Sequence, residues 1–213
     1  TTDNQAAFDE GVASVDITTD NQAAFDEGVA SVDITTDNQA AFDEGVASVG
    51  TVVCVGANLT GANLQMADLS GANLTDAELT KTDLSGADLT GAILKNVSGM
   101  RSRWRDAYLG EADLSDADLA GADLTDVDAS DGILARAMLN GARLKRAILV
   151  KTGLSAADLA DAYMAEADLK EANLTGAQMH EANLTKTDLT KTRLGASDLT
   201  KAKMQGVQNS NPP

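Results

Sequence analysis

A five-residue repeat runs through most of the chain and limits what the chain can fold into. From residue 57 to residue 206 the register holds through 30 consecutive units, as in the stretch GANLTGANLQMADLSGANL at residues 56–74. The first position of a unit is alanine 21 times, and the third position is leucine 24 times. Both positions must therefore face an interior that excludes water.

Neither regular secondary structure accommodates this period. On an α-helix a step of five residues advances about 140° beyond a full turn, which scatters the leucines around the cylinder. On a flat strand an odd step sends successive leucines to opposite faces. A chain that turns a corner every five residues instead points one small and one large side chain inward on each short side. Because stacked turns of this kind bury a continuous column, the repeat predicts a solenoid.

A different repeat precedes the solenoid. Residues 1–17, TTDNQAAFDEGVASVDI, recur identically at 18–34 and again from residue 35 to residue 49. Their period of 17 does not match the period of five, so we divide the chain into an acidic N-terminal segment at 1–46, a solenoid at 47–206 and a C-terminal tail at 207–213.

The third copy of the 17-residue repeat carries signals for a short helix. Its Thr36 and Gln39 fit a capping box, and Phe42 and Val46 form an apolar pair four residues apart. We expect residues 35–46 to act as a cap in which Phe42 covers the first coil of the solenoid.

The repeat units resemble the A(D/N)LXX motif of pentapeptide-repeat proteins. The resemblance is carried by units such as ANLTG at 57–61, ADLSG at 67–71 and ADLTG at 87–91, and it covers about 150 residues. It implies an all-β solenoid, a right-handed quadrilateral β-helix in which four five-residue units complete each coil. With coils about 4.8 Å apart, seven or eight coils make a rod roughly 35–40 Å long.

Three residues at the leucine position depart from the pattern: Gly99, Trp104 and Ala129. Their volumes compensate if the indole of Trp104 occupies space released by the two small residues. Alternatively, residues 96–106 form a loop, because a ten-residue insertion preserves the register. Since the register continues without a slip, we favour a continuous coil with local distortion.

The charge of the chain is unevenly distributed. The net charge is −17, but residues 1–46 contain 11 acidic residues and no lysine or arginine, which leaves −6 for the remainder. The acidic character of the solenoid is interrupted by Arg143, Lys145, Arg146 and Lys151. One column that recurs once per coil stays acidic, with Asp68, Asp88, Asp128, Asp168 and Asp188. The repeat motif alone also accounts for this column, because Asp or Asn before the leucine is the pattern of the family that the chain resembles.

Catalytic chemistry has few candidate residues. The single histidine, His180, occupies an outward position, and the single cysteine, Cys54, occupies an inward leucine position. These two residues supply neither a nucleophile with an oriented base nor a Cys/His zinc site. We therefore expect no enzymatic activity, no cofactor and no metal. No run of apolar residues approaches the length of a membrane span, so we expect no membrane insertion.

Function is then expected on the outer surface. Most outward positions are polar, and the exceptions are Ile93, Tyr108, Ile133, Ile148 and Val150. Four-sided registration places these five residues, here called the edge patch, on two adjacent faces, with Arg143 and Lys145 at its rim. An exposed aromatic residue with aliphatic neighbours suits the core of a protein interface, although scattered surface apolar residues are also ordinary.

The expected function is a noncatalytic structural or assembly module that presents a rigid rod to a protein partner, as a subunit of a larger complex. The alternative follows from the family resemblance, because acidic rods of that family mimic DNA and modulate bacterial type II topoisomerases. The resemblance also implies a thylakoid lumen or a bacterial cytoplasm as the compartment. We expect no direct binding of nucleic acid, and the two open ends of the solenoid predict end-to-end self-association.

Overall fold

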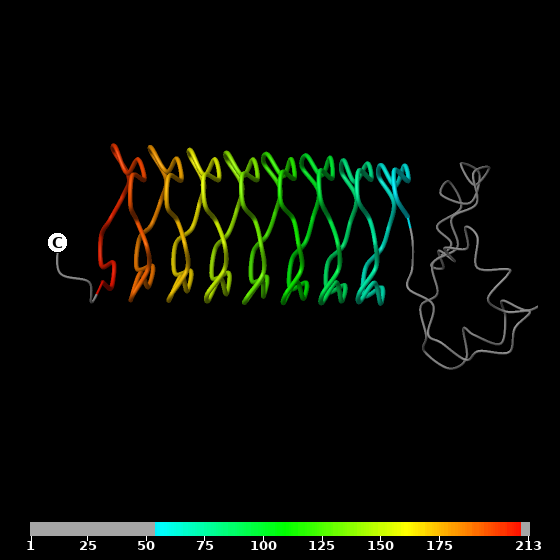
Figure 1. Ribbon diagram of the computed structural model, residues 1–213, viewed down its shortest axis with the longest axis horizontal. Coiled ribbons are helices and arrows are strands. Elements are labelled where there is room, and N and C mark those ends of the chain that lie inside the picture. Colours follow the sequence, from blue (N-terminus) through cyan, green and yellow to red (C-terminus); the bar gives the residue numbers. More distant parts are fainter. Residues whose placement is uncertain (1–53, 210–213) are drawn as a thin grey trace, which may run out of the picture.

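The computed structural model describes residues 54–209, in which the chain winds as a regular solenoid (Figure 1). Each residue at the second position of a unit forms a parallel β-bridge with the equivalent residue four units later, from Asn58↔Glu78 to Asp188↔Gln208. A coil therefore consists of four units and has four short sides, and the described residues make nearly eight coils. The predicted quadrilateral β-helix is confirmed, and the last bridged residue, Gln208, lies two residues inside the predicted tail.

We name the four faces of the rod by their bridged residues. Face A carries residue 58 and every twentieth residue after it to 198, and face B carries residues 63 to 203 at the same spacing. Face C carries residues 68 to 208, and face D carries residues 73 to 193. The chain passes through the faces in the order A, B, C, D, so faces A and C lie on opposite sides of the rod.

The backbone hydrogen bonds explain why short, cornered sides are stable. In each unit of the interior coils the first residue donates its N–H across the preceding turn, and the second donates to the preceding coil. The third and fifth residues donate to the following coil. In the unit at 122–126 these four N···O distances are 2.9, 2.9, 2.7 and 3.0 Å. Only the N–H of the fourth residue lacks a backbone acceptor, and a buried or half-buried donor of this kind needs another partner.

The side chain at the second position supplies that partner. Asp123 Oδ1, for example, accepts a hydrogen bond of 3.2 Å from the N–H of Thr125. All 16 Asp and Asn residues at the second position of the described units make this bond to the residue two places later. The turn therefore favours Asp or Asn before the leucine, because these short side chains reach their own backbone.

Every corner is a tight turn with a left-handed residue at the fifth position. The residues at these positions, from Gly56 to Gly206, have φ between 56° and 73°, and 22 of them are not glycine. A positive φ at the third residue of a four-residue turn that is closed by an i to i+3 hydrogen bond is characteristic of type II turns. The side chains at these corners point away from the interior, so the corners carry much of the surface charge of the rod.

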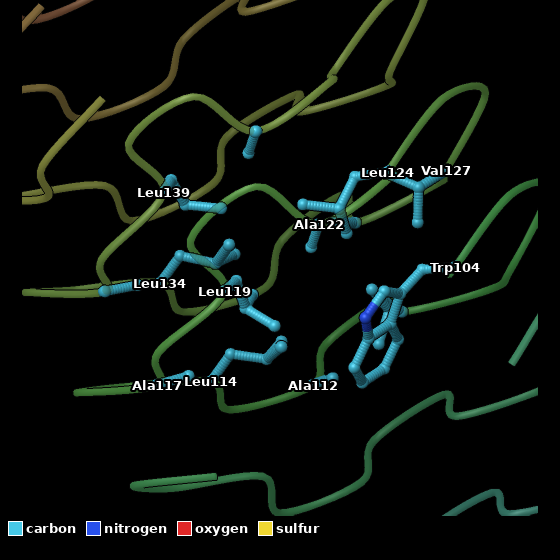
Figure 2. Close-up of a cluster of buried hydrophobic side chains, with 14 of the residues drawn as sticks. Trp104, Ala112, Leu114, Ala117, Leu119, Ala122, Leu124, Val127, Leu134 and Leu139 are labelled. Atoms are coloured by element: carbon cyan, nitrogen blue, oxygen red, sulfur yellow. The ribbon is translucent and has the colours of Figure 1, made fainter. Parts of the chain in front are cut away.

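Leucines and alanines from all four sides fill the interior. Leu124 and Leu144 are each only 1% exposed, and they stack with Trp104 in the column behind face B. Figure 2 shows Trp104 and Leu124 among the leucines and alanines that point inward. The prediction that the leucine position faces an interior that excludes water is confirmed at both residues.

Residues 96–106 continue the coil without a loop. Ser98 bridges Glu78 in the preceding coil and Asp118 in the following coil, and Arg103 bridges its neighbouring coils in the same way. The predicted continuous coil is therefore confirmed. The alternative loop is wrong, because a ten-residue insertion would leave these two second-position residues unbridged.

The coil adapts locally to Trp104, whose side chain is fully buried. The Nε1–H of Trp104 donates a hydrogen bond of 2.5 Å to Ser102 Oγ, and the Ser102 hydroxyl donates in turn to the carbonyl of Gly99. A Cβ atom at Gly99 would lie 2.8 Å from Leu119 Cδ2. Leu119 of the following coil therefore occupies the place beside Gly99. The other small residue, Ala129, is also buried.

The last coil has a less covered interior than the others. Leu194 and Leu199 are half-buried and Met204 is 41% exposed, whereas the leucines of the preceding coils are buried. The predicted cap, with Phe42 and Val46, and the acidic repeats at 1–46 lie outside the described residues. Among residues 54–209 no helix has the length and apolar character needed to cross a membrane.

Candidate functional site

The edge patch lies around the corner between faces C and D. Tyr108 and Ile148 are second-position residues of face C, Ile93 and Ile133 are second-position residues of face D, and Val150 lies at the corner between the two faces. Tyr108 is 56% exposed, and the three isoleucines are exposed as well. The structure thus places the five residues on two adjacent faces, as the spacing predicts.

Aspartates separate the apolar residues within each column. On face C, Tyr108 is bridged to Asp88 and Asp128, and Ile148 is bridged to Asp128 and Asp168. The predicted acidic column and two of the five edge-patch residues therefore share one face. We call the run Asp88, Tyr108, Asp128, Ile148, Asp168 the face C ladder. Acidic and apolar side chains alternate along it at every coil.

The apolar residues occupy positions where the turn would favour Asp or Asn. Six second-position residues are large and apolar, and none of them makes the hydrogen bond to the N–H two residues later, because their side chains lack a carboxylate or amide oxygen within reach of it. They are Ile93, Tyr108, Ile133, Met138, Ile148 and Tyr163. A hydrogen bond of this kind contributes about 0.5–1.5 kcal/mol, so each replacement forgoes some stability. Local departures from what a fold requires are expected at functional surfaces.

Two of these six residues were not among the predicted site residues. Met138 lies on face A and is 44% exposed, and Tyr163 lies on face B and is 40% exposed. The signal that identifies them is an apolar residue at the second position of the unit, which becomes informative once the turn bond is known. They lie outside the edge patch, because their faces do not flank the corner between faces C and D.

The two predicted rim residues lie on the other side of face C. Arg143 is a face B residue that bridges Asp123 and Tyr163, and its Nε lies 4.0 Å from Asp123 Oδ1. Lys145 is at the corner between faces B and C. Both cations therefore border the face C ladder on its face B side, away from Ile93 and Ile133.

The acidic residues of face C differ in their pairing. Within residues 54–209, Asp68, Asp88 and Asp128 make no ion pair. By contrast, Lys170 Nζ lies 3.0 Å from Asp168 Oδ2 and 3.3 Å from Asp188 Oδ2. The uncompensated negative charge of face C is therefore concentrated towards its N-terminal half.

The neighbouring faces neutralise their acidic residues more fully. On face B, Arg103 Nε lies 3.0 Å from Asp83 Oδ2. On face D, Asp113 Oδ2 lies 3.1 Å from Lys95 Nζ. Among the unpaired carboxylates of face C, Asp68 is stabilised as an anion, because hydrogen bonds from the hydroxyl and N–H of Ser70 lower its pKa below the usual value.

The chemically reactive side chains do not converge on this surface. Cys54 is buried, and burial raises the pKa of its thiol to about 12, so the nucleophilic thiolate is scarce at neutral pH. His180 is exposed at a corner between faces A and B. Among residues 54–209, no group of three or more His, Cys, Asp or Glu side chains is arranged to hold a metal ion.

The fold can be compared with known structures. HetL, a pentapeptide repeat protein involved in heterocyst differentiation regulation from the cyanobacterium Nostoc, is 24% identical over 79% of this chain and 92% of its own, with a TM-score of 0.32. Full-length QnrB1, a plasmid-mediated fluoroquinolone resistance protein, is 19% identical over 76% and 94%, with a TM-score of 0.36. A pentapeptide repeat protein from the Arabidopsis thaliana thylakoid lumen is 27% identical over 67% and 78%, with a TM-score of 0.24.

The sequence itself can be compared with families and with curated proteins. No curated protein matches it. The family profile described as pentapeptide repeats matches eight copies, at residues 54–96, 105–137, 112–152, 154–190 and 177–208. These matches cover well over half of the chain and coincide with the bridged coils. The chain therefore belongs to the pentapeptide-repeat family.

Proposed function

We propose that the protein is a noncatalytic structural or assembly module that presents a rigid rod to another protein, as a subunit of a larger complex. The observation that carries the proposal is the edge patch, where four exposed apolar side chains replace the Asp or Asn that the turn favours. Tyr108 is the centre of this surface. Tyrosine supplies a large contact area with little loss of side-chain entropy, and it is enriched among residues that dominate binding energy.

The scaffold beneath the patch supports this role. Four of the five backbone N–H groups in an interior unit are bonded to backbone carbonyls, and most of these bonds link neighbouring coils. The side chains of the edge patch are therefore held on a fixed backbone before a partner arrives. Because association costs entropy for every segment that becomes ordered, a pre-organised surface binds more tightly than a mobile one of the same area.

Replacement of Tyr108 tests the patch. We expect Tyr108→Asp to leave the fold intact, because the side chain points outward and Asp is the usual residue at this position. We expect the same change to abolish recovery of the partner, because it removes the aromatic contact and adds a charge at the centre of the interface. The measurement is affinity purification of the tagged full chain from its native host, followed by mass spectrometry.

A matched control is available within the chain. Tyr163 occupies the same position of a unit but lies on face B, so Tyr163→Asp makes the same chemical change outside the patch. We expect this variant to recover the partner as the wild type does. Unchanged recovery with Tyr108→Asp, or an equal loss with both variants, would remove the edge patch as the binding site.

The alternative function is that of a DNA mimic acting on a type II topoisomerase. The unpaired Asp68, Asp88 and Asp128 on face C favour it, because DNA carries an unbroken line of negative charge. The apolar interruptions at Tyr108 and Ile148 and the ion pairs of faces B and D count against it. A gyrase supercoiling assay separates the two functions. Inhibition or protection at stoichiometric concentration favours the mimic, and no effect favours the assembly module.

A further inference from the structure

We propose that the face C ladder binds a cationic amphipathic α-helix of the partner, laid along the rod so that it contacts Tyr108 and Ile148. This inference rests on the proposed function and specifies the chemistry of its partner. It follows from three properties of the ladder, which are its unpaired charge, its spacing and its alternation.

The surroundings of Tyr108 select a cation. Asp88 and Asp128 are its bridged neighbours in the column. Asp106 and Glu111 are exposed at the two corners that flank Tyr108 along the chain. None of these four carboxylates makes an ion pair within residues 54–209. A lysine or arginine side chain placed here would meet carboxylates on several sides, and it could also lie against the exposed ring.

The spacing of the ladder selects a helix. Successive coils lie about 4.8 Å apart. On one face of an α-helix, residues spaced alternately three and four positions apart are separated by about 5.25 Å on average along the helix axis. Over the four steps from Asp88 to Asp168, the helix positions therefore move out of alignment with the coils by only about 2 Å. On one face of an extended strand, alternate residues are separated by about 6.7 Å, so over the same four steps they move out of alignment with the coils by roughly 8 Å. A helix can therefore stay in register with all five residues of the ladder.

The alternation then specifies the sequence pattern of that helix. The unpaired carboxylates of Asp88 and Asp128 favour cations at one set of positions, and Tyr108 and Ile148 favour apolar residues at the set between them. In heptad terms the partner carries Lys or Arg at position a and an apolar residue at position d. The ladder ends near Asp168, because Lys170 already lies against Asp168 and Asp188.

The opposite face offers an internal comparison. On face A, Met138 lies between Asp118 and Asp158, which repeats the acidic and apolar alternation over only three coils. Asp118 and Asp158 occupy the same position of the unit as Asp88 and Asp128. Equivalent substitutions on faces A and C therefore make equal changes in total charge and differ only in location.

A synthetic peptide tests the proposal. The probe is a fluorescein-labelled, alanine-based peptide of about three heptads with Lys at a and Leu at d, about 31 Å long when helical. The comparison peptide has the same composition with Lys and Leu alternating at every second residue. Fluorescence anisotropy with the full chain at near-physiological salt measures both affinities. We expect the heptad peptide to bind at least about tenfold more tightly than the comparison peptide.

Substitutions locate the binding. Asn occurs naturally at five of the described second positions and makes the same turn bond, so Asp88→Asn with Asp128→Asn removes charge and keeps the turn. We expect this pair to weaken binding of the heptad peptide at least about tenfold. We expect the face A pair, Asp118→Asn with Asp158→Asn, to leave the affinity within about twofold.

Two outcomes would overturn the inference. Equal weakening by the face A and face C pairs would mean that the peptide responds only to overall charge, and equal binding of the two peptides would mean that helical spacing is not recognised. Either outcome leaves the proposed function standing if Tyr108→Asp still abolishes partner recovery while Tyr163→Asp does not. If the two tyrosine variants recovered the partner equally while the heptad peptide still bound to face C, the proposed function would be wrong instead.

Discussion

Replacing Trp104 with alanine is expected to lower the free energy of unfolding by about 3–5 kcal/mol, the usual cost of removing a buried tryptophan. The indole is fully buried in the column behind face B, and stacked coils above and below limit how far the cavity can close. The substitution also removes the N–H that donates to Ser102 Oγ. Urea denaturation followed by far-ultraviolet circular dichroism measures the loss.

A second variant separates packing from hydrogen bonding at this site. Trp104→Phe keeps an aromatic ring in the column but lacks the N–H donor, while the Ser102 hydroxyl can still donate to the Gly99 carbonyl. We expect this variant to lose less than half of what Trp104→Ala loses. A Trp104→Ala protein as stable as the wild type would mean that the indole is not part of the core.

Truncation of the leucines in the same column is expected to cost nearly as much. Leu124→Ala and Leu144→Ala should each lower the free energy of unfolding by about 2–5 kcal/mol through lost transfer energy and the cavity left behind. Arg143→Ala is the matched control. It lies next to Leu144 in sequence but its side chain is 63% exposed, so its effect should stay within about 0.5 kcal/mol.

The two leucine variants also test the stacking of coils. Leu124 and Leu144 lie one coil apart and are adjacent in one column, so their cavities share neighbours. The double variant should therefore depart from the sum of the single effects by more than about 0.5 kcal/mol, which is the usual limit for independent sites. Strict additivity, or a negligible loss in either single variant, would contradict the four-unit coil.

Much of the fold follows from the amino-acid pattern, and the limits of that inference have physical causes. A leucine every five residues excludes helix and strand and requires a corner in each unit. The number of corners per coil depends on which residues pair across coils, and the period of five does not contain that information. The predicted four-sided coil came from the family resemblance, and the bridges of the structure confirm it.

The interior at Trp104 shows a similar limit. The sequence predicts that the large indole of Trp104 is compensated by small residues at other leucine positions. It does not predict that the Ser102 hydroxyl connects the indole N–H to the Gly99 carbonyl, or that Leu119 lies against Gly99. These details depend on side-chain directions across neighbouring coils, which differ from unit to unit.

The candidate site was predictable in its parts but not as a whole. Tyr108 and Ile148 lie one and three whole coils beyond Asp88, so their shared face is implicit in the spacing once the coil length is known. Met138 and Tyr163 were missed because an outward apolar residue is ordinary on a protein surface. Their positions become informative only when the side chain at the second position is known to satisfy the turn.

Site-specific photo-crosslinking tests the central claim, that the edge patch contacts a protein partner, most directly. A photoreactive phenylalanine analogue is incorporated at Tyr108 or, in a parallel variant, at Tyr163, and the tagged full chain is irradiated in its native host. The account predicts a covalent adduct of one defined mass from position 108, identified as a single protein by mass spectrometry, and little or none from position 163. No adduct at position 108, or equal adducts at both positions, would contradict it.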